Sequence, residues 1–262
     1  MQDFSFHRPS TVAEAVGLLK SAPEGKLLSG GQSYLPILKL GLAAPSHVIS
    51  LAKVAELQGI RVDGARLVIG AGQTHASVHE SAVVKQKIAA LAGLAGGIGD
   101  AQVRNRGTLG GSLAHADPAA DYPSAVLALD AVITTDRRQI AADQFFSGLF
   151  STVLGRDEVV TSVSFAIPTR AAYVKFPHPS SKYAIVGAFV AVHPSGVRVA
   201  ITGARASAFR WTQAEQALTA RFAADAVPTG FATAGLNEDP DFSAEYRANL
   251  VSVLTRRAVA AA

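Results

Sequence analysis

The spacing of apolar side chains divides the first two thirds of the chain into short helices and strands. Apolar residues recur at helical spacing from Val12 to Leu19, behind Ser10 and Thr11, which can cap a helix, and Pro23 marks its end. Similar spacing predicts helices over residues 35–40, 74–80, 84–94 and 123–129. Short apolar runs bounded by turn-forming residues predict strands at 26–28, 48–51, 60–62, 67–70, 131–134 and 159–167.

The last third of the chain has a different order of elements. Strands are predicted at 173–176, 188–192 and 197–201, with a turn at 193–196, and helices follow at 213–222 and 246–261. A run of strands followed by a run of helices is typical of a separate α+β unit. We therefore place a boundary at residues 166–172 and predict domains of 1–168 (subdomains about 1–55 and 56–168) and 169–262.

The segment 100–121 stands out because it has no strong helical or strand period. It is rich in Gly, Asn, Asp and Pro, yet it carries the apolar residues Val103, Leu109 and Leu113. A stretch of this length without regular structure inside a compact domain is usually functional or disordered. The apolar residues favour an ordered, functional segment.

Composition narrows the class of protein. Among the 262 residues, 49% are hydrophobic and 17% are charged, which predicts a well-packed globular protein whose apolar surface is partly covered by partner subunits. The net charge of +4 is mild and its basic residues are scattered, so we expect no nucleic-acid partner. The absence of cysteine excludes disulfides, Cys-ligated zinc and Cys-ligated iron–sulfur clusters. No signal peptide and no transmembrane segment are predicted, and we expect a cytoplasmic protein.

Two glycine loops are the main candidates for chemistry. Residues 29–33 (SGGQS) follow a predicted strand, and residues 106–112 (RGTLGGS) lie within the irregular segment. Paired glycines permit positive φ, so that consecutive backbone N–H groups can point into one concavity and hold a phosphate or pyrophosphate. Hydroxyls of Ser33, Thr108 and Ser112 can add donors. One such loop alone would be interpreted as a tight turn, whereas two together favour a phosphate site.

Other candidate motifs are weaker. Residues 70–75 begin like a dinucleotide fingerprint but lack its third glycine, so they are interpreted as a turn at a strand end. His75 and His79 are four residues apart without the glutamate of a zinc-protease motif, which argues against a metal site. His115, Asp117 and Asp121 form a polar cluster, in which Asp121 is favoured as an acceptor for sugar hydroxyls of a bound nucleotide and His115 as a packing residue.

Taken together, these motifs resemble the FAD-binding medium subunit of the molybdenum hydroxylases, the xanthine dehydrogenase and carbon monoxide dehydrogenase family. The resemblance runs over nearly the whole chain, through FHRP at 6–9 and LSGGQSYLP at 28–36. It is strongest in the twenty-residue string QVRNRGTLGGSLAHADPAAD at 102–121, which is far more specific than a bare glycine motif.

The resemblance implies an α+β fold. The first domain would be the two-subdomain FAD-binding domain of the PCMH/vanillyl-alcohol-oxidase type, followed by a small α+β C-terminal domain of the CO dehydrogenase flavoprotein type. The segments 29–33 and 108–112 would hold the FAD pyrophosphate, and Val160 would lie near the flavin or adenine. The implied cofactor-contact residues are Ser29, Gly30, Gly31, Gln32, Ser33, Tyr34, Thr108, Leu109, Gly110, Gly111, Ser112, Asp121, Val160 and Lys182. No general acid or base and no metal ligand is implied in this chain.

The resemblance also implies an electron relay within a complex. A large molybdopterin-binding subunit would hydroxylate the substrate, and a small [2Fe–2S] subunit would pass the electrons to the FAD of this chain. The flavin would then reduce an external electron acceptor, in a dimer of heterotrimers. Ser29 and Gln32 differ from the Ala-Gly-Gly-His-Ser loop of carbon monoxide dehydrogenases, which argues against a CO-oxidising complex.

Two other functions stay open from the sequence. One is a self-contained FAD-dependent oxidase or dehydrogenase, which would need a substrate-covering domain larger than the C-terminal unit predicted here. The other is a non-catalytic nucleotide-binding assembly module, against which the twenty-residue string is the main argument.

Overall fold

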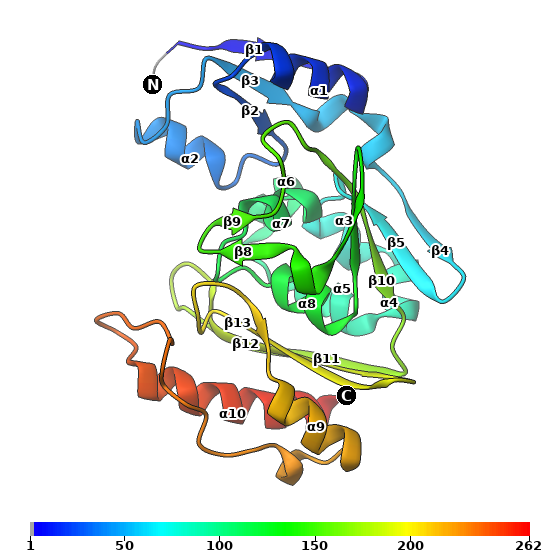
Figure 1. Cartoon of the computed structure of the whole chain (residues 1–262), viewed down its shortest axis with the longest axis vertical. Helices are drawn as coiled ribbons and strands as arrows, with labels where there is room; N and C mark the ends of the chain where they lie inside the picture. Colours follow the sequence, from blue (N-terminus) through cyan, green and yellow to red (C-terminus); the bar gives the residue numbers. More distant parts are fainter. Residues whose placement is uncertain (1–2) are drawn as a thin grey trace.

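The computed structural model describes residues 3–262, which form three tiers along the long axis of the molecule (Figure 1). The first tier is a parallel three-stranded sheet in the order β1-β3-β2, formed by Ser5–His7, His47–Ser50 and Gly25–Leu28. Helices α1 (Val12–Ser21) and α2 (Tyr34–Lys39) accompany this sheet. This tier corresponds to the first predicted subdomain.

Helix α1 forms where the apolar spacing predicts it. Its N-cap is Thr11, whose side chain accepts a hydrogen bond from the backbone N–H of Glu14, and such a cap satisfies one of the free amides of the first turn. Its buried face is Val12, Ala15, Val16 and Leu19. The same face packs in one core cluster with strand β3, so the helix is fixed to the sheet by apolar burial.

The second tier is an antiparallel five-stranded sheet in the order β4-β5-β10-β6-β7. Its strands are Ile60–Asp63, Arg66–Gly70, Val160–Ala166, Val132–Thr135 and Gln139–Ala141. The predicted hairpin at 60–70 is β4 and β5. Six short helices pack around the sheet: α3 (His75–Glu80), α4 (Ala82–Lys87), α5 (Ala89–Gly96), α6 (Ala101–Arg106), α7 (Leu109–His115) and α8 (Tyr122–Ala128). A small hairpin of β8 (Phe146–Gly148) and β9 (Ser151–Thr152) adjoins them.

Two predictions for this tier are wrong. The single helix predicted over 84–94 is two helices, because the backbone leaves the helical region at Ile88 (φ −144°, ψ 73°) while its side chain stays buried. The segment 100–121 is not irregular, since it contains α6 and α7. Each begins with a side-chain cap, in which Asp100 accepts from the N–H of Val103 and Thr108 accepts from that of Gly111. Helices of six or seven residues are too short to show a clear apolar period.

The third tier is the antiparallel sheet β11-β12-β13-β14, formed by Arg170–Pro177, Ala184–His193, Gly196–Thr202 and Phe209–Arg210. Helices α9 (Thr212–Ala220) and α10 (Ala244–Ala261) cover its outer face (Figure 1). Helices α5 and α8 of the second tier pack against the strands from the other side. Strand β12 is therefore buried along nearly its whole length, which explains its continuous apolar sequence.

The second and third tiers share a core. Phe189 and Ala191 of β12 and Ala200 of β13 belong to the same buried cluster as α8 and the five-stranded sheet. Strand β10 ends at Ala166 and β11 begins at Arg170, but the division into domains at residue 168 stays a prediction. Within residues 3–262, no helix is both long enough and apolar enough to span a membrane.

Candidate functional site

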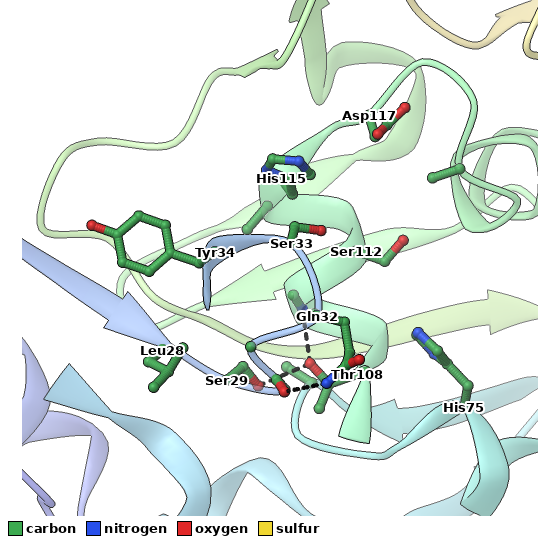
Figure 2. A pocket seen from close by; sticks show the side chains of 18 of the residues that line it. Leu28, Ser29, Gln32, Ser33, Tyr34, His75, Thr108, Ser112, His115 and Asp117 are labelled. Atoms are coloured by element: carbon green, nitrogen blue, oxygen red, sulfur yellow. Dashed lines mark hydrogen bonds between the residues drawn. The ribbon is translucent and has the colours of Figure 1, made fainter. Parts of the chain in front are cut away.

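A cavity of about 620 Å³ lies where the three tiers meet, and its size is typical of a site for a small organic ligand. Its walls come from the end of β2 with the loop behind it, the segment from Gly107 to Asp121, the start of β10 and the turn between β11 and β12. Figure 2 shows Ser33 and Ser112 on two different segments of the wall, with Thr108 and Ser29 close together below them.

The cavity collects nearly all of the predicted cofactor-contact residues. Those that line it are Ser29, Gly30, Gly31, Gln32, Ser33, Tyr34, Thr108, Gly110, Gly111, Ser112, Asp121, Val160 and Lys182. The exception is Leu109, which is fully buried in the core of the second tier and does not line the cavity. The structure thus brings these side chains together, and their contacts with a cofactor stay a prediction.

The first glycine loop presents a row of free backbone donors. Within residues 3–262, the five consecutive N–H groups of residues 30–34 make no hydrogen bond to another part of the chain. Gly31 has a φ of +76°, a conformation that glycine adopts without strain and that turns neighbouring amides toward one side. The side chain of Gln32 folds back and donates to the carbonyl of Gly30 (3.2 Å). An anion such as a pyrophosphate fits this donor set.

The two glycine loops touch each other directly. A Cβ atom at Gly30 would overlap the carbonyl oxygen of Arg106, so only glycine permits the approach. The hydroxyls of Ser29 and Thr108 are hydrogen-bonded at 2.8 Å (Figure 2). Ser29 and Gln32, the two departures from the carbon monoxide dehydrogenase loop, are thus both engaged in contacts within these loops.

The backbone amides of the second glycine loop are bonded within the chain. Leu109 N–H donates to Gln73 O (3.0 Å), Gly110 N–H to Ala71 O (2.8 Å) and Gly111 N–H to the Thr108 hydroxyl (3.1 Å). These three amides therefore have acceptors within the chain, and the contact of this loop with the pyrophosphate stays a prediction. A Cβ at Gly110 would lie 2.5 Å from the Cβ of Ala71, so this glycine serves the packing of the wall rather than an open cleft.

Asp121 lies in the cavity wall, and its side chain is held from the third tier. The carboxylate is only 4% exposed, accepts a hydrogen bond from the hydroxyl of Tyr173 and pairs with the Lys175 ammonium (2.9 and 3.1 Å). Burial raises the pKa of Asp121, and the charge of Lys175 opposes that rise. Sequence reasoning identified Asp121 but missed both partners, which lie more than fifty residues away.

His75 is a cavity residue that was considered only as a metal ligand. Its ring is 5% exposed and packs against Tyr122 with 5.4 Å between centroids. Among the described residues, neither its Nδ1 atom nor the buried Tyr122 hydroxyl has a hydrogen-bond partner. Burial, with Arg104 nearby, lowers the pKa of His75 to about 4, so the ring is neutral at pH 7. His79 is separately engaged, with its Nδ1 atom 2.8 Å from Ala92 O.

His115 and Asp117 of the predicted polar cluster also line the cavity. The His115 ring packs on Phe150 at the tip of the β8–β9 hairpin (5.2 Å between centroids), as expected for a packing residue. In residues 3–262, no group of three or more His, Cys, Asp or Glu side chains could hold a metal ion.

Two further cavity residues, Glu158 and Tyr183, are not among the predicted cofactor-contact residues. Arg138 and the Thr135 hydroxyl bind the Glu158 carboxylate (both 2.8 Å), and these contacts lower its pKa to about 2. Burial raises the pKa of Tyr183, and the charge of Asp117 adds to this effect. An acidic residue directly before the apolar run of β10 was the only signal for Glu158 in the sequence.

Comparison with known proteins identifies the family. Residues 2–169 match the family described as the FAD binding domain in molybdopterin dehydrogenase. The medium chain of carbon monoxide dehydrogenase from Hydrogenophaga pseudoflava is 35% identical, over 99% of this chain and 96% of the relative. The medium subunit of nicotine 6-hydroxylase from Paenarthrobacter nicotinovorans is also 35% identical, over 96% and 94%.

Solved structures agree with this assignment. Carbon monoxide dehydrogenase from Hydrogenophaga pseudoflava superposes with a TM-score of 0.91 at 35% identity, covering 100% of this chain and 97% of the other. Quinoline 2-oxidoreductase from Pseudomonas putida 86 also gives a TM-score of 0.91, at 29% identity and the same coverage. The predicted resemblance and the α+β fold class are confirmed. The chain therefore belongs to the family of FAD-binding medium subunits of molybdenum hydroxylases, and it is an oxidoreductase subunit whose cofactor is FAD.

Proposed function

We propose that the chain holds FAD in the 620 Å³ cavity and relays electrons from a small [2Fe–2S] subunit to an external acceptor. It does so in a cytoplasmic complex with a large molybdopterin-binding subunit, assembled as a dimer of heterotrimers. When bound, a flavin can accept electrons singly from iron–sulfur centres and release them singly or in pairs, and the protein supplies position and access. The observation that carries the proposal is the row of free amides at residues 30–34 on the cavity wall.

These amides are proposed to bind the pyrophosphate of the cofactor. Five adjacent N–H dipoles offer hydrogen bonds to an anion without a charged side chain, and no internal bond has to be broken when the anion arrives. The amides of residues 109–111 are already bonded within the chain, so the second loop contributes the shape of the wall and the Ser112 hydroxyl. Asp121, Val160 and Lys182 are proposed to contact other parts of the cofactor, as their place in the wall supports.

Exposed apolar side chains beside the cavity support the docking of the [2Fe–2S] subunit there. Leu40 and Leu42, which follow α2, are 73% and 74% exposed, and Leu149 and Phe150 at the tip of the β8–β9 hairpin are more than half exposed. Phe150 packs on His115, a cavity residue, so this hairpin lies at the cavity. In Figure 1, α2 and the hairpin lie on the same side of the molecule. A partner bound there would cover this apolar surface next to the flavin.

A charge substitution in the first loop tests the proposed anion site. Ser33 is the N-cap of α2 and makes no side-chain capping bond, and both Asp and Asn are good N-cap residues. Ser33→Asp therefore adds a negative charge without removing a helix cap. Two like charges 4 Å apart repel by about 1 kcal/mol in bulk water and about 4 kcal/mol near a protein surface. We expect Ser33→Asp to weaken FAD binding at least about tenfold.

Ser33→Asn is the matched control, because it has nearly the same shape without the charge. FAD affinity is measured by titrating the cofactor-free chain and following flavin fluorescence, with thermal melting as a check on folding. Wild-type affinity in Ser33→Asp, or equal losses in the two variants, would contradict an anion site at this loop. A chain that takes up no FAD under any condition would contradict the proposed function itself.

A further inference from the structure

Lys175 joins three separate parts of the chain at the FAD cavity. Its ammonium donates to the carbonyl of Gly97 at the end of α5 (2.9 Å), to the carbonyl of Lys182 in the β11–β12 turn (3.0 Å) and to the Asp121 carboxylate. Its side chain is only 11% exposed. A lysine has three N–H donors, so these acceptors use its full bonding capacity.

The β11–β12 turn forms part of the cavity wall. Ser181, Lys182 and Tyr183 line the cavity from this turn, although each of them is exposed on its other side. Lys182 has a φ of +63°, an unfavourable conformation for a residue other than glycine, which persists only where surrounding contacts hold it. The turn is closed by its own bonds between His178 and residues 182 and 183. The Lys175 ammonium that donates to Lys182 O also donates to Asp121, and it thereby connects the turn to the cavity wall of the second tier.

We propose that Lys175 is a positioning residue that fixes the β11–β12 turn across the FAD cavity by bridging the Lys182 carbonyl to Asp121 and Gly97. The inference rests on the proposed function, because it assigns the turn to the wall of the FAD site. It also gives Asp121 a second role beside the proposed contact with the cofactor. The carboxylate is the buried counter-charge that holds the ammonium in place, with Tyr173 as its second donor.

We call the bonds from Lys175 to Lys182 O, Gly97 O and Asp121 the Lys175 clamp, and a single substitution in it should release the turn. Removing the ammonium leaves Asp121 charged or protonated in a buried site with one remaining partner, and it leaves the carbonyls of Gly97 and Lys182 without their donor. The turn then keeps its internal bonds and the bond from Ala184 N–H to Ala119 O (3.2 Å) at its end, but it loses the bonds that lead to Asp121 and Gly97. We expect it to open locally while the sheet below, whose strand β12 is buried along nearly its whole length, remains folded.

Limited proteolysis of the full chain without FAD measures the turn directly. Trypsin cuts after Lys182, and cleavage after the exposed Lys87 at the end of α4 serves as an internal reference. We expect Lys175→Met to accelerate the cut at Lys182 about tenfold relative to the cut at Lys87, because local opening controls cleavage. An unchanged ratio would overturn the proposal. If Lys175→Met does not fold, Asp121→Asn decides, since it should give a smaller acceleration while keeping the contact from Lys175 to Lys182.

A double variant separates a clamp from a simple charge effect. If the faster cleavage of Lys175→Met came only from the unpaired Asp121 carboxylate, the double variant Asp121→Asn/Lys175→Met would restore the wild-type cleavage ratio. A clamp predicts no restoration, because the Lys182 carbonyl still lacks its donor. Lys175→Arg keeps the positive charge and the N–H donors, so its ratio of cleavage at Lys182 to cleavage at Lys87 should lie closer to wild type than that of Lys175→Met.

The cofactor supplies a second, spectroscopic measurement. With FAD loaded, iodide should quench the flavin fluorescence of Lys175→Met several-fold more than that of the wild type, because the open turn admits solvent to the cavity. Equal quenching with an accelerated cut would show a turn that moves but does not cover the flavin, and would overturn the assignment to the FAD site. Because the proteolysis needs no FAD, its result stands apart from whether the proposed function is correct.

Discussion

Protonation of His75 should destabilise the folded chain as the pH falls from 6.5 to 4. Burial lowers the pKa of this imidazole to about 4 in the folded state, whereas a free histidine has a pKa of about 6.5. Between these values the unfolded chain binds a proton that the folded chain rejects. The stability that the neutral ring permits is complete above pH 6.5 and is lost as the pH falls through 4. At about 1.4 kcal/mol per pH unit, this interval corresponds to about 3 kcal/mol.

Urea unfolding of the cofactor-free chain at pH 7.5, 6, 5 and 4 measures this effect against His75→Gln. Carboxylates also titrate toward pH 4, so the relevant quantity is the difference between wild type and variant. We expect the wild type to lose about 3 kcal/mol more than His75→Gln over this range. His115→Gln, a substitution in the same cavity wall, should keep the wild-type slope, because His75 is intact in it. Parallel slopes for wild type and His75→Gln would show that the imidazole is protonated in the fold and would refute the reasoning.

Three further substitutions test other contacts. Gly30→Ala should destabilise the chain by about 1–3 kcal/mol in urea unfolding and abolish FAD retention, because the added Cβ overlaps a carbonyl of the facing loop. Gly17→Ala is the control and should not lower the stability, because the space around Gly17 is open. Glu158→Gln should lower the free energy of unfolding by about 1.5–3 kcal/mol at pH 7, because it weakens the bond to Arg138. The difference in stability between wild type and variant should shrink as the pH falls from 4.5 toward 2, since the wild-type carboxylate then becomes protonated. A difference that stays constant in unfolding measurements would contradict this. Leu42→Asp should leave the melting temperature unchanged but reduce copurification of the [2Fe–2S] subunit, and undiminished copurification would place that subunit elsewhere.

Local sequence signals predicted most elements whose contacts are local. The helix behind Thr11 has its cap and its apolar face within ten residues, and the hairpin around Asp63-Gly64 has both strands and its turn in one short segment. The break at Ile88 could not be predicted in this way. The residue fits the apolar period of a continuous helix, and the bend is explained only by the separate packing of α4 on β4 and of α5 on α3 and β11.

The residues of the site were easier to predict than their bonds. The string at 102–121 and the loop at 29–33 identified the cavity wall, because these residues are consecutive in the sequence. Whether the amides of the second loop are free or hydrogen-bonded depends on a third segment of the chain. Residues 71–75, interpreted only as a turn at the end of a strand, run beside residues 107–110 and accept the hydrogen bonds of Leu109 and Gly110. No local pattern indicates that pairing.

The two glycine loops therefore have different roles, although the sequence predicted the same role for both. The first keeps its amides free, which suits an anion that comes and goes with the cofactor. The second uses its amides to bind residues 71–75, and its Gly110 allows Ala71 to approach, while Gly30 of the first loop allows the two loops to touch. A rigid wall opposite an open row of donors is what a preorganised site requires, since the donors then need no rearrangement when the ligand binds. The same logic extends to the third tier, where Tyr173 and Lys175 hold Asp121 in that wall. The predicted boundary at residue 168 runs through this site, because residues on both sides of it line the cavity.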